Sequence, residues 1–212
     1  MKIFLCLLTA LVFSTQVQAH NLWLERDGDG PVRVYFGHYD TQILEKTGDR
    51  LDIIKAEKII PGGTVLSRQR QADHIELNIA TPSGIALIEA MNPRKTRTAE
   101  EIIRTVFLAR NSPSLTGKEL PLDLVTQQSN DHSFTLLLNG VPAPASEINV
   151  YDPDLQKQVY TTDKKGRVTL DVNKAGRYLV LATAIVEEGG SVNNIPYDKT
   201  RYSFTLTFVT KN

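Results

Sequence analysis

Short stretches of alternating apolar and polar residues, separated by turn-forming residues, run through most of the chain. The clearest pair lies at residues 22–26 and 32–36, on either side of a turn rich in Gly and Asp at 27–31. Alternation at every second position indicates a half-buried strand, and a Gly-containing turn between two such strands indicates a hairpin. We therefore predict a β-hairpin over residues 22–36.

The same pattern continues to the end of the sequence. Apolar segments of strand length, bounded by Gly, Pro, Asn and Asp, indicate β-strands at regular spacing. Further strands are expected at 51–60, 64–68, 74–80, 85–90, 122–125, 134–138, 147–151, 158–162, 167–172, 176–185 and 201–210.

One segment favours a helix instead. Residues 98–101 resemble a capped helix start, and Ile102, Ile103, Val106 and Phe107 follow at helical spacing. We expect one short helix here.

A polar region at 112–130, rich in Ser, Pro, Gly, Gln and Asn, indicates a connection between two parts of the chain. The strands beyond it have the spacing typical of a β-sandwich. The predicted fold class is all-β, with two β-sandwich-like modules and the short helix between them. The expected divisions are a signal peptide at 1–19, an N-terminal β module at 20–127 and a C-terminal transthyretin- or immunoglobulin-like sandwich at 128–212.

The signal peptide is predicted from three features. Lys2 supplies a positive start, residues 3–13 form an apolar run too short to span a bilayer, and small residues Val17 and Ala19 suit a signal peptidase. Cleavage after Ala19 would make His20 the first residue of the mature chain. We expect a periplasmic protein without a membrane-inserted segment.

Composition agrees with an exported protein that binds no nucleic acid. Lys plus Arg and Asp plus Glu both total 24, so loss of Lys2 with the signal would leave a net charge of −1. The only cysteine, Cys6, lies inside the apolar run, so the mature chain would have no thiol and no disulfide.

A histidine at a mature N-terminus has special chemistry. A free α-amino group titrates near pKa ~8, so part of it is unprotonated near neutral pH and able to donate to a metal ion. The amine and the ring Nδ1 of His20 would close one chelate ring on a single ion. One more imidazole would complete a three-nitrogen set suited to Cu(II) or Ni(II). Alternatively, His20 is an ordinary surface histidine, because chain termini are commonly disordered.

His38 is the expected second imidazole. It follows Gly37 where the second strand of the hairpin ends, and antiparallel pairing would bring that end beside His20. The predicted metal ligands are His20 and His38.

Four other residues have open roles. Glu25, Tyr39 and Asp40 flank the predicted site and would supply an axial oxygen or a hydrogen-bond acceptor, or are plain surface residues. His74 alternates with apolar residues on a strand, so a solvent-facing histidine is favoured over a ligand.

Motifs for catalysis are absent from the sequence. There is no Gly-x-Ser-x-Gly elbow, no mature cysteine and no phosphate-binding loop. We expect no enzyme and no catalytic residues.

Several motifs together resemble a known family. "AHNLWLE", "VYFGHYD", "GKELPLDLV", "FTLLLNGVPAPASEINVY", "TTDKKGRVTL", "AGRYLVLATA" and "IPYDKTRYSFTLTF" occur in the order found in the DUF4198 family of exported bacterial proteins. Members of that family are often labelled periplasmic components of nickel or cobalt uptake. The C-terminal half also resembles the carboxypeptidase regulatory or transthyretin-like β-sandwich, through its "NG-x-P" turn and "TTD-x-x-G" hairpin.

The sequence and this resemblance favour a periplasmic protein that binds Ni, Co or Cu and acts in metal uptake or delivery. Its expected partners are the metal ion and a membrane metal transporter. The alternative is a non-catalytic β-sandwich module that binds a partner protein or a glycan. Oxidative glycan cleavage shares the same ligand chemistry, but a single tryptophan, Trp23, offers little for a flat aromatic binding face.

Overall fold

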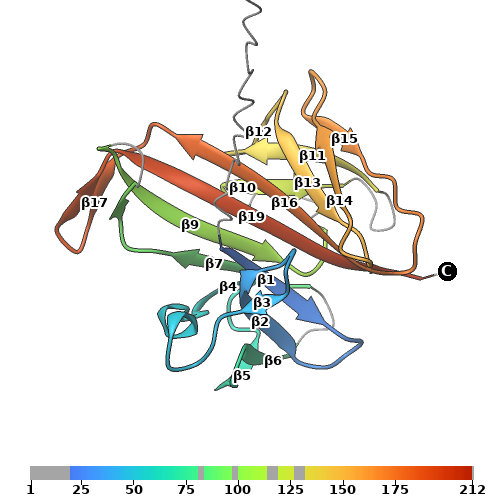
Figure 1. The fold of residues 1–212 in the computed structure, drawn as a ribbon, viewed down its shortest axis with the longest axis horizontal. Helices are drawn as coiled ribbons and strands as arrows, with labels where there is room; N and C mark the ends of the chain where they lie inside the picture. Colours follow the sequence, from blue (N-terminus) through green and yellow to red (C-terminus); the bar gives the residue numbers. More distant parts are fainter. Residues whose placement is uncertain (1–19, 81–83, 97–99, 114–118, 127–131, 212) are drawn as a thin grey trace, which may run out of the picture.

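The computed structural model describes residues 20–80, 84–96, 100–113, 119–126 and 132–211, and its regular structure is almost entirely β (Figure 1). This confirms the predicted all-β class. The one helical element in these ranges is a 3-10 turn, η1 (Arg50–Ile53). Among the described residues, no helix has the length and apolar character needed to cross a membrane. The predicted signal peptide lies outside the described residues.

Eight strands form the large sheet, which is the centre of the molecule (Figure 1). Its order is β14 (Lys157–Thr161), β13 (Glu147–Tyr151), β16 (Gly176–Val186), β19 (Lys199–Thr210), β9 (Ile102–Arg110), β7 (Ala86–Ala90) and β4 (Lys58–Ile60), with β8 (Arg94–Lys95) paired to β9. All these pairs are antiparallel except β9 and β19, which run parallel. Strands from both sides of the predicted boundary at 127/128 therefore share one sheet. The boundary falls outside the described residues and stays a prediction.

The prediction of a short helix beginning near residue 98 is wrong. Residues 97–99 lie outside the described residues, but Ile102–Arg110 is strand β9, buried between β19 and β7. Both faces of this strand contact apolar layers, so its apolar residues need not alternate. A run of this kind fits helical and strand spacing equally well, and the pairing partners decide the outcome. The expected strand at 51–60 is also only partly correct, because η1 occupies its start.

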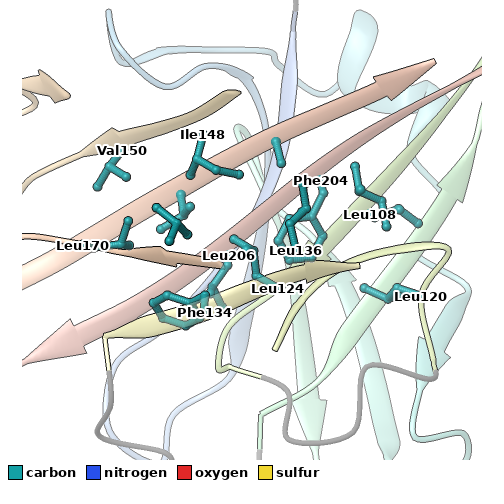
Figure 2. Packing of buried hydrophobic residues seen from close by; sticks show 14 of the residues in the cluster. Leu108, Leu120, Leu124, Phe134, Leu136, Ile148, Val150, Leu170, Phe204 and Leu206 are labelled. Atoms are coloured by element: carbon teal, nitrogen blue, oxygen red, sulfur yellow. The ribbon is translucent and has the colours of Figure 1, made fainter. Parts of the chain in front are cut away.

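The cover sheet packs on one face of the large sheet and encloses the main core. It consists of β10 (Leu122–Val125), β11 (Ser133–Leu138), β12 (Val141–Pro142) and β15 (Arg167–Thr169). Figure 2 shows Phe134, Leu136 and Leu124 of this sheet packed towards Phe204 and Leu206 of β19.

A buried ion pair also joins these two sheets. The guanidinium of Arg110 on β9 donates to the carboxylate of Asp123 on β10 at 2.9 Å. Asp123 is fully buried. Burial raises the pKa of Asp123 to about 6, and the nearby Arg110 charge opposes that rise. Because a buried charge is costly unless it is paired, the two residues hold the sheets in one relative position.

The small sheet lies on the opposite face of the large sheet. It contains β1 (Asn21–Arg26), β2 (Val32–His38), β6 (Ile75–Ile79) and β5 (Val65–Arg70) in that order, with β3 (Ile43–Leu44) paired to β2. The predicted first hairpin is confirmed by the β1–β2 pairing. A separate hairpin, β17 (Gly190–Val192) and β18 (Ile195–Tyr197), connects β16 to β19.

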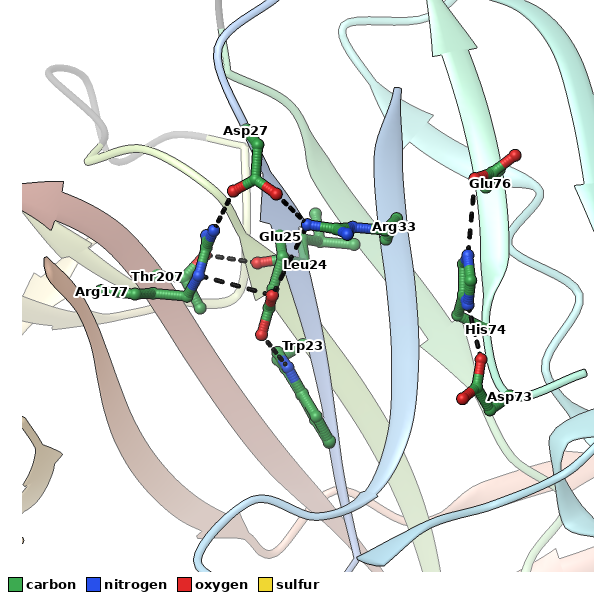
Figure 3. A network of polar contacts seen from close by, with 10 residues as sticks. All are labelled: Trp23, Leu24, Glu25, Asp27, Arg33, Asp73, His74, Glu76, Arg177 and Thr207. Carbon is green, nitrogen blue, oxygen red and sulfur yellow. Dashed lines mark hydrogen bonds and ion pairs between the residues drawn. The ribbon is translucent and has the colours of Figure 1, made fainter. Parts of the chain in front are cut away.

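Strand β1 is an edge of the small sheet, and this edge lies against β19. The hydroxyl of Thr205 donates to the carbonyl of Leu22 at 2.7 Å. The hydroxyl of Thr207 donates to the carbonyl of Leu24, as Figure 3 shows. Because buried carbonyls must find donors, these threonines replace the missing neighbouring strand. Side chains on both faces of β1 are buried. Leu22 packs in a cluster with Phe107, and Trp23 packs against Leu179, Tyr39 and Tyr35.

Removing both hydroxyls tests this anchoring. We expect the double substitution Thr205→Val and Thr207→Val to lower the free energy of unfolding by about 2–5 kcal/mol, since each change leaves a buried carbonyl without a donor. Thr161→Val, at an exposed position of β14, is the control and should change stability little. Urea denaturation followed by fluorescence of Trp23 gives both values. A double variant as stable as the control would contradict the anchoring role.

Candidate metal centre

The structure brings His20 and His38 together at the start of the small sheet. Their ring centroids lie 4.4 Å apart. The cause is the hairpin register: Asn21 pairs with Gly37, so the residue before β1 lies across from the residue at the end of β2. The convergence predicted from the sequence is therefore present, although a shared metal ion stays a prediction.

Gly37 allows the chain to fold back beside this pair. Its φ is +153°, and a Cβ at this position would lie 2.2 Å from the carbonyl oxygen of Ile43. Only glycine permits β3 to approach so closely. The return brings Glu45 next to β2, where its backbone N–H donates to the carbonyl of Phe36 at 2.8 Å.

Glu45 is a site residue that the sequence analysis missed. Its carboxylate accepts a hydrogen bond from Nε2 of His20. Because a carboxylate only accepts, Nε2 carries the proton in this hydrogen bond, and in the neutral ring Nδ1 then keeps its lone pair. This is the tautomer needed for chelation by Nδ1 and the amine of the same residue. Arg50 lies beside the pair, with Nη1 3.9 Å from the Glu45 carboxylate and 3.3 Å from Nε2 of His20.

His38 contributes an unsatisfied nitrogen. Its Nδ1 is buried and has no hydrogen-bond partner among the described residues. A buried polar atom without a partner costs about 1–3 kcal/mol, so such atoms are rare and commonly mark a site that a ligand completes. Together with the orientation of His20, this orphaned nitrogen fits a metal-binding role.

Two of the flanking residues considered from the sequence are committed elsewhere. The carboxylate of Glu25 accepts a hydrogen bond from the indole of Trp23 at 3.0 Å and pairs with Arg177 at 3.4 Å (Figure 3). Tyr39 is buried against Trp23. Burial raises the pKa of Tyr39 to about 12, and the negative charge of Glu25 contributes to this rise as the next largest cause. Near neutral pH its phenol stays protonated and is a poor metal ligand.

His74 and Asp40 also lie outside the histidine pair. Nδ1 of His74 bonds to Asp73 at 2.7 Å (Figure 3). The ring of His74 lies beside Tyr35, which alternation places on the opposite face of β2 from His38. The hydrogen bond to His74 is the main reason that the pKa of Asp73 is lowered. Asp40 lines a cleft beside His20.

In the part of the chain that the structure describes, no three His, Cys, Asp or Glu side chains are arranged to hold a metal ion. Side chains at this site supply two imidazoles, those of His20 and His38. A third nitrogen would have to come from the α-amino group of His20, which exists only after cleavage of the preceding peptide bond.

Two cavities flank His20. One, of about 200 Å³, is lined mainly by apolar groups that include Phe36, Met91 and Ile103. The other is a cleft of about 510 Å³ over the large sheet, lined by Asp40, Tyr151 and other polar residues. Both linings include His20, Thr105 and Phe107, so the histidine lies between the two cavities.

No family model, no curated protein and no solved structure matches the chain. The resemblance to the DUF4198 family therefore stays an expectation from the sequence motifs.

A substitution at His38 distinguishes a ligand from a structural residue. In metal-free protein we expect His38→Phe to leave the free energy of unfolding unchanged or to raise it by about 1 kcal/mol, because an unpaired buried nitrogen is removed. Denaturation in the presence of EDTA measures this. Gly37→Ala is the contrast, and should destabilise the protein because its Cβ collides with Ile43. A large loss of stability in His38→Phe would assign the ring a structural partner instead.

Proposed function

We propose that this chain is an exported, periplasmic protein that binds Ni(II), Co(II) or Cu(II) through His20 and His38 and acts in metal uptake or delivery. The observation that carries the proposal is the pair of converging imidazoles. One of them is oriented by Glu45, and the other keeps a buried nitrogen without a partner.

The donor set suits these ions. Imidazole and amine nitrogens are ligands of intermediate softness that Cu(II), Ni(II) and Co(II) accept readily. Acidic oxygens do not surround the pair, since the nearest carboxylate, Glu45, is already bonded to His20. Ca²⁺ and Mg²⁺, which require several oxygen ligands, are therefore poor candidates.

Cleavage of the signal peptide would control binding in this proposal. Before cleavage the backbone nitrogen of His20 is part of an amide, whose lone pair is delocalised and donates weakly to metals. After cleavage it is an amine next to Nδ1 of the same residue. The protein would thus bind metal tightly only once it has been processed during export, and not in its precursor form.

The non-catalytic expectation belongs to the same proposal: the ion is cargo, received outside the cytoplasm and passed to a membrane transporter or to another metalloprotein. A module that binds a partner protein or a glycan remains the competing function. Metal affinity separates the two, because an interaction module has no need of a processed N-terminus.

Comparing two N-termini tests the proposal. We expect the chain that begins at His20 to bind Cu(II) and Ni(II) much more tightly than a chain that begins at Thr15, which retains five further native residues and lacks an amine at His20. His38→Phe in the mature chain should also weaken binding. Both losses should exceed the roughly 10–100-fold that follows loss of an outer-shell partner. Competition with a chromophoric chelator measures the affinities.

The two comparisons test the two nitrogen ligands separately. Equal affinity of the two chains would exclude the amine, and equal affinity of His38→Phe and the parent would exclude the second imidazole. Absence of tight binding by the mature chain would favour the interaction module.

Glu45 provides a graded test of the same site. We expect Glu45→Gln to weaken Cu(II) binding about 10–100-fold, because the amide no longer holds the proton on Nε2 as strongly. Glu57→Gln, an exposed change of the same type, is the control. Titrations at several pH values should show weaker binding at lower pH in every variant, since protons compete for the nitrogens. Unchanged affinity in Glu45→Gln would remove the orienting role of this carboxylate.

A further inference from the structure

The cleft beside His20 exists because the small sheet covers only part of the large sheet. Strand β1 packs on β19 at Thr205 and Thr207 and begins at Asn21. Successive residues of β19 alternate between faces, so Arg201 and Ser203 point to the same side as these threonines but lie beyond β1. Over them the face is open and forms the cleft of about 510 Å³.

Two cations in this cleft form no ion pair with a described residue. Arg201 on β19 and Lys157 on β14 line it, and neither has an ion pair or a side-chain hydrogen bond there. Two other cations on this face are paired: Arg177 with Glu25 at 3.4 Å, and Lys199 with Glu101 at 2.9 Å. Arg94 also forms no ion pair with a described residue, but it lines the smaller, mainly apolar cavity.

Uncharged polar groups complete the lining. Thr183 and Ser203 bring hydroxyls, and Asn149 on β13 has a buried Oδ1 with no partner. Asp40 is the one acidic residue among the described residues that line the cleft, and it lies near Tyr151, whose pKa is raised by burial and by the Asp40 charge. The cleft therefore has a net positive charge together with hydrogen-bond donors and acceptors.

The size, charge and hydrogen-bonding groups of the cleft indicate the class of ligand that would fit it. The volume lies within the range of small-molecule sites. Arginine and lysine recognise carboxylates, and Oδ1 of Asn149 accepts from a hydroxyl. His20 forms part of the wall, so an ion held by His20 is within reach of an anion in the cleft.

We propose that the protein receives its metal as a chelate with a small hydroxycarboxylate anion, and that the anion stays bound in the cleft between Arg201, Lys157 and Asn149 while His20 holds the ion. This inference rests on the proposed metal-binding function and extends it to the form of the cargo. Two groups of ligands, protein nitrogens and anion oxygens, would then share one metal ion.

The test uses the mature chain with Cu(II) and radiolabelled citrate as the probe. Equilibrium dialysis measures citrate retained with and without one equivalent of Cu(II), while competition with a chelator measures Cu(II) affinity. We expect citrate to be retained only with Cu(II). The double variant Arg201→Gln and Lys157→Gln should lose at least about tenfold in citrate retention, since two charged contacts are removed. Its Cu(II) affinity in the absence of citrate should be unchanged, which also shows that it is folded.

Lys164→Gln together with Lys165→Gln is the control, because it removes the same charge from the exposed turn between β14 and β15, whose lysines do not line the cleft. Citrate retained equally by the cleft variant and the control would overturn the assignment of Arg201 and Lys157. Citrate retained without Cu(II) would show an anion site unrelated to the metal. Cu(II) bound tightly with no citrate retained would overturn this inference and leave the proposed function intact. Absence of Cu(II) binding would end both.

Discussion

An unpaired strand edge, satisfied by two threonine hydroxyls, determines the position of everything at the site. Buried edge carbonyls are costly, and exposed edges promote unwanted pairing. Here Thr205 and Thr207 reach up from the face of the large sheet and bond the carbonyls of Leu22 and Leu24. The edge strand β1 of the small sheet is thereby fixed on β19. The position at which β1 begins, next to His20, is fixed as well, and the face of the large sheet beyond this point stays uncovered. The location of His20 and the existence of the cleft both follow from that placement.

Unsatisfied polar atoms gather at the same place. Four buried side-chain atoms of the described residues lack hydrogen-bond partners, and two of them, Nδ1 of His38 and Oδ1 of Asn149, lie next to His20 or line the adjacent cleft. Natural proteins tolerate few such atoms, because each costs stability. Their concentration around one histidine agrees with a site whose last partners come from outside the chain.

Local pairing was predictable from the sequence, and long-range pairing was not. The hairpin register follows from alternation and a short turn, and it places His20 opposite His38 without knowledge of any other strand. Glu45 was missed because it arrives through a two-residue strand that depends on Gly37, a contact that periodicity does not reveal. The segment 102–110 was assigned to a helix because its apolar residues satisfy both periods, and only its neighbours β19 and β7 make it a strand. The parallel pairing of this strand with β19 joins two regions that lie on either side of the polar segment 112–130 in the sequence.

The central position of β19 has a consequence for the order in which the molecule is completed. This strand lies between β16 and β9 and also holds the carbonyls of β1, from which Thr205 is separated by 183 residues. Contacts of such large sequence separation form late and slowly. During synthesis, the large sheet stays split and the first hairpin stays unanchored until β19 has left the ribosome. The large sheet therefore closes only after nearly all of the described residues have been synthesised, an order that suits the export proposed above.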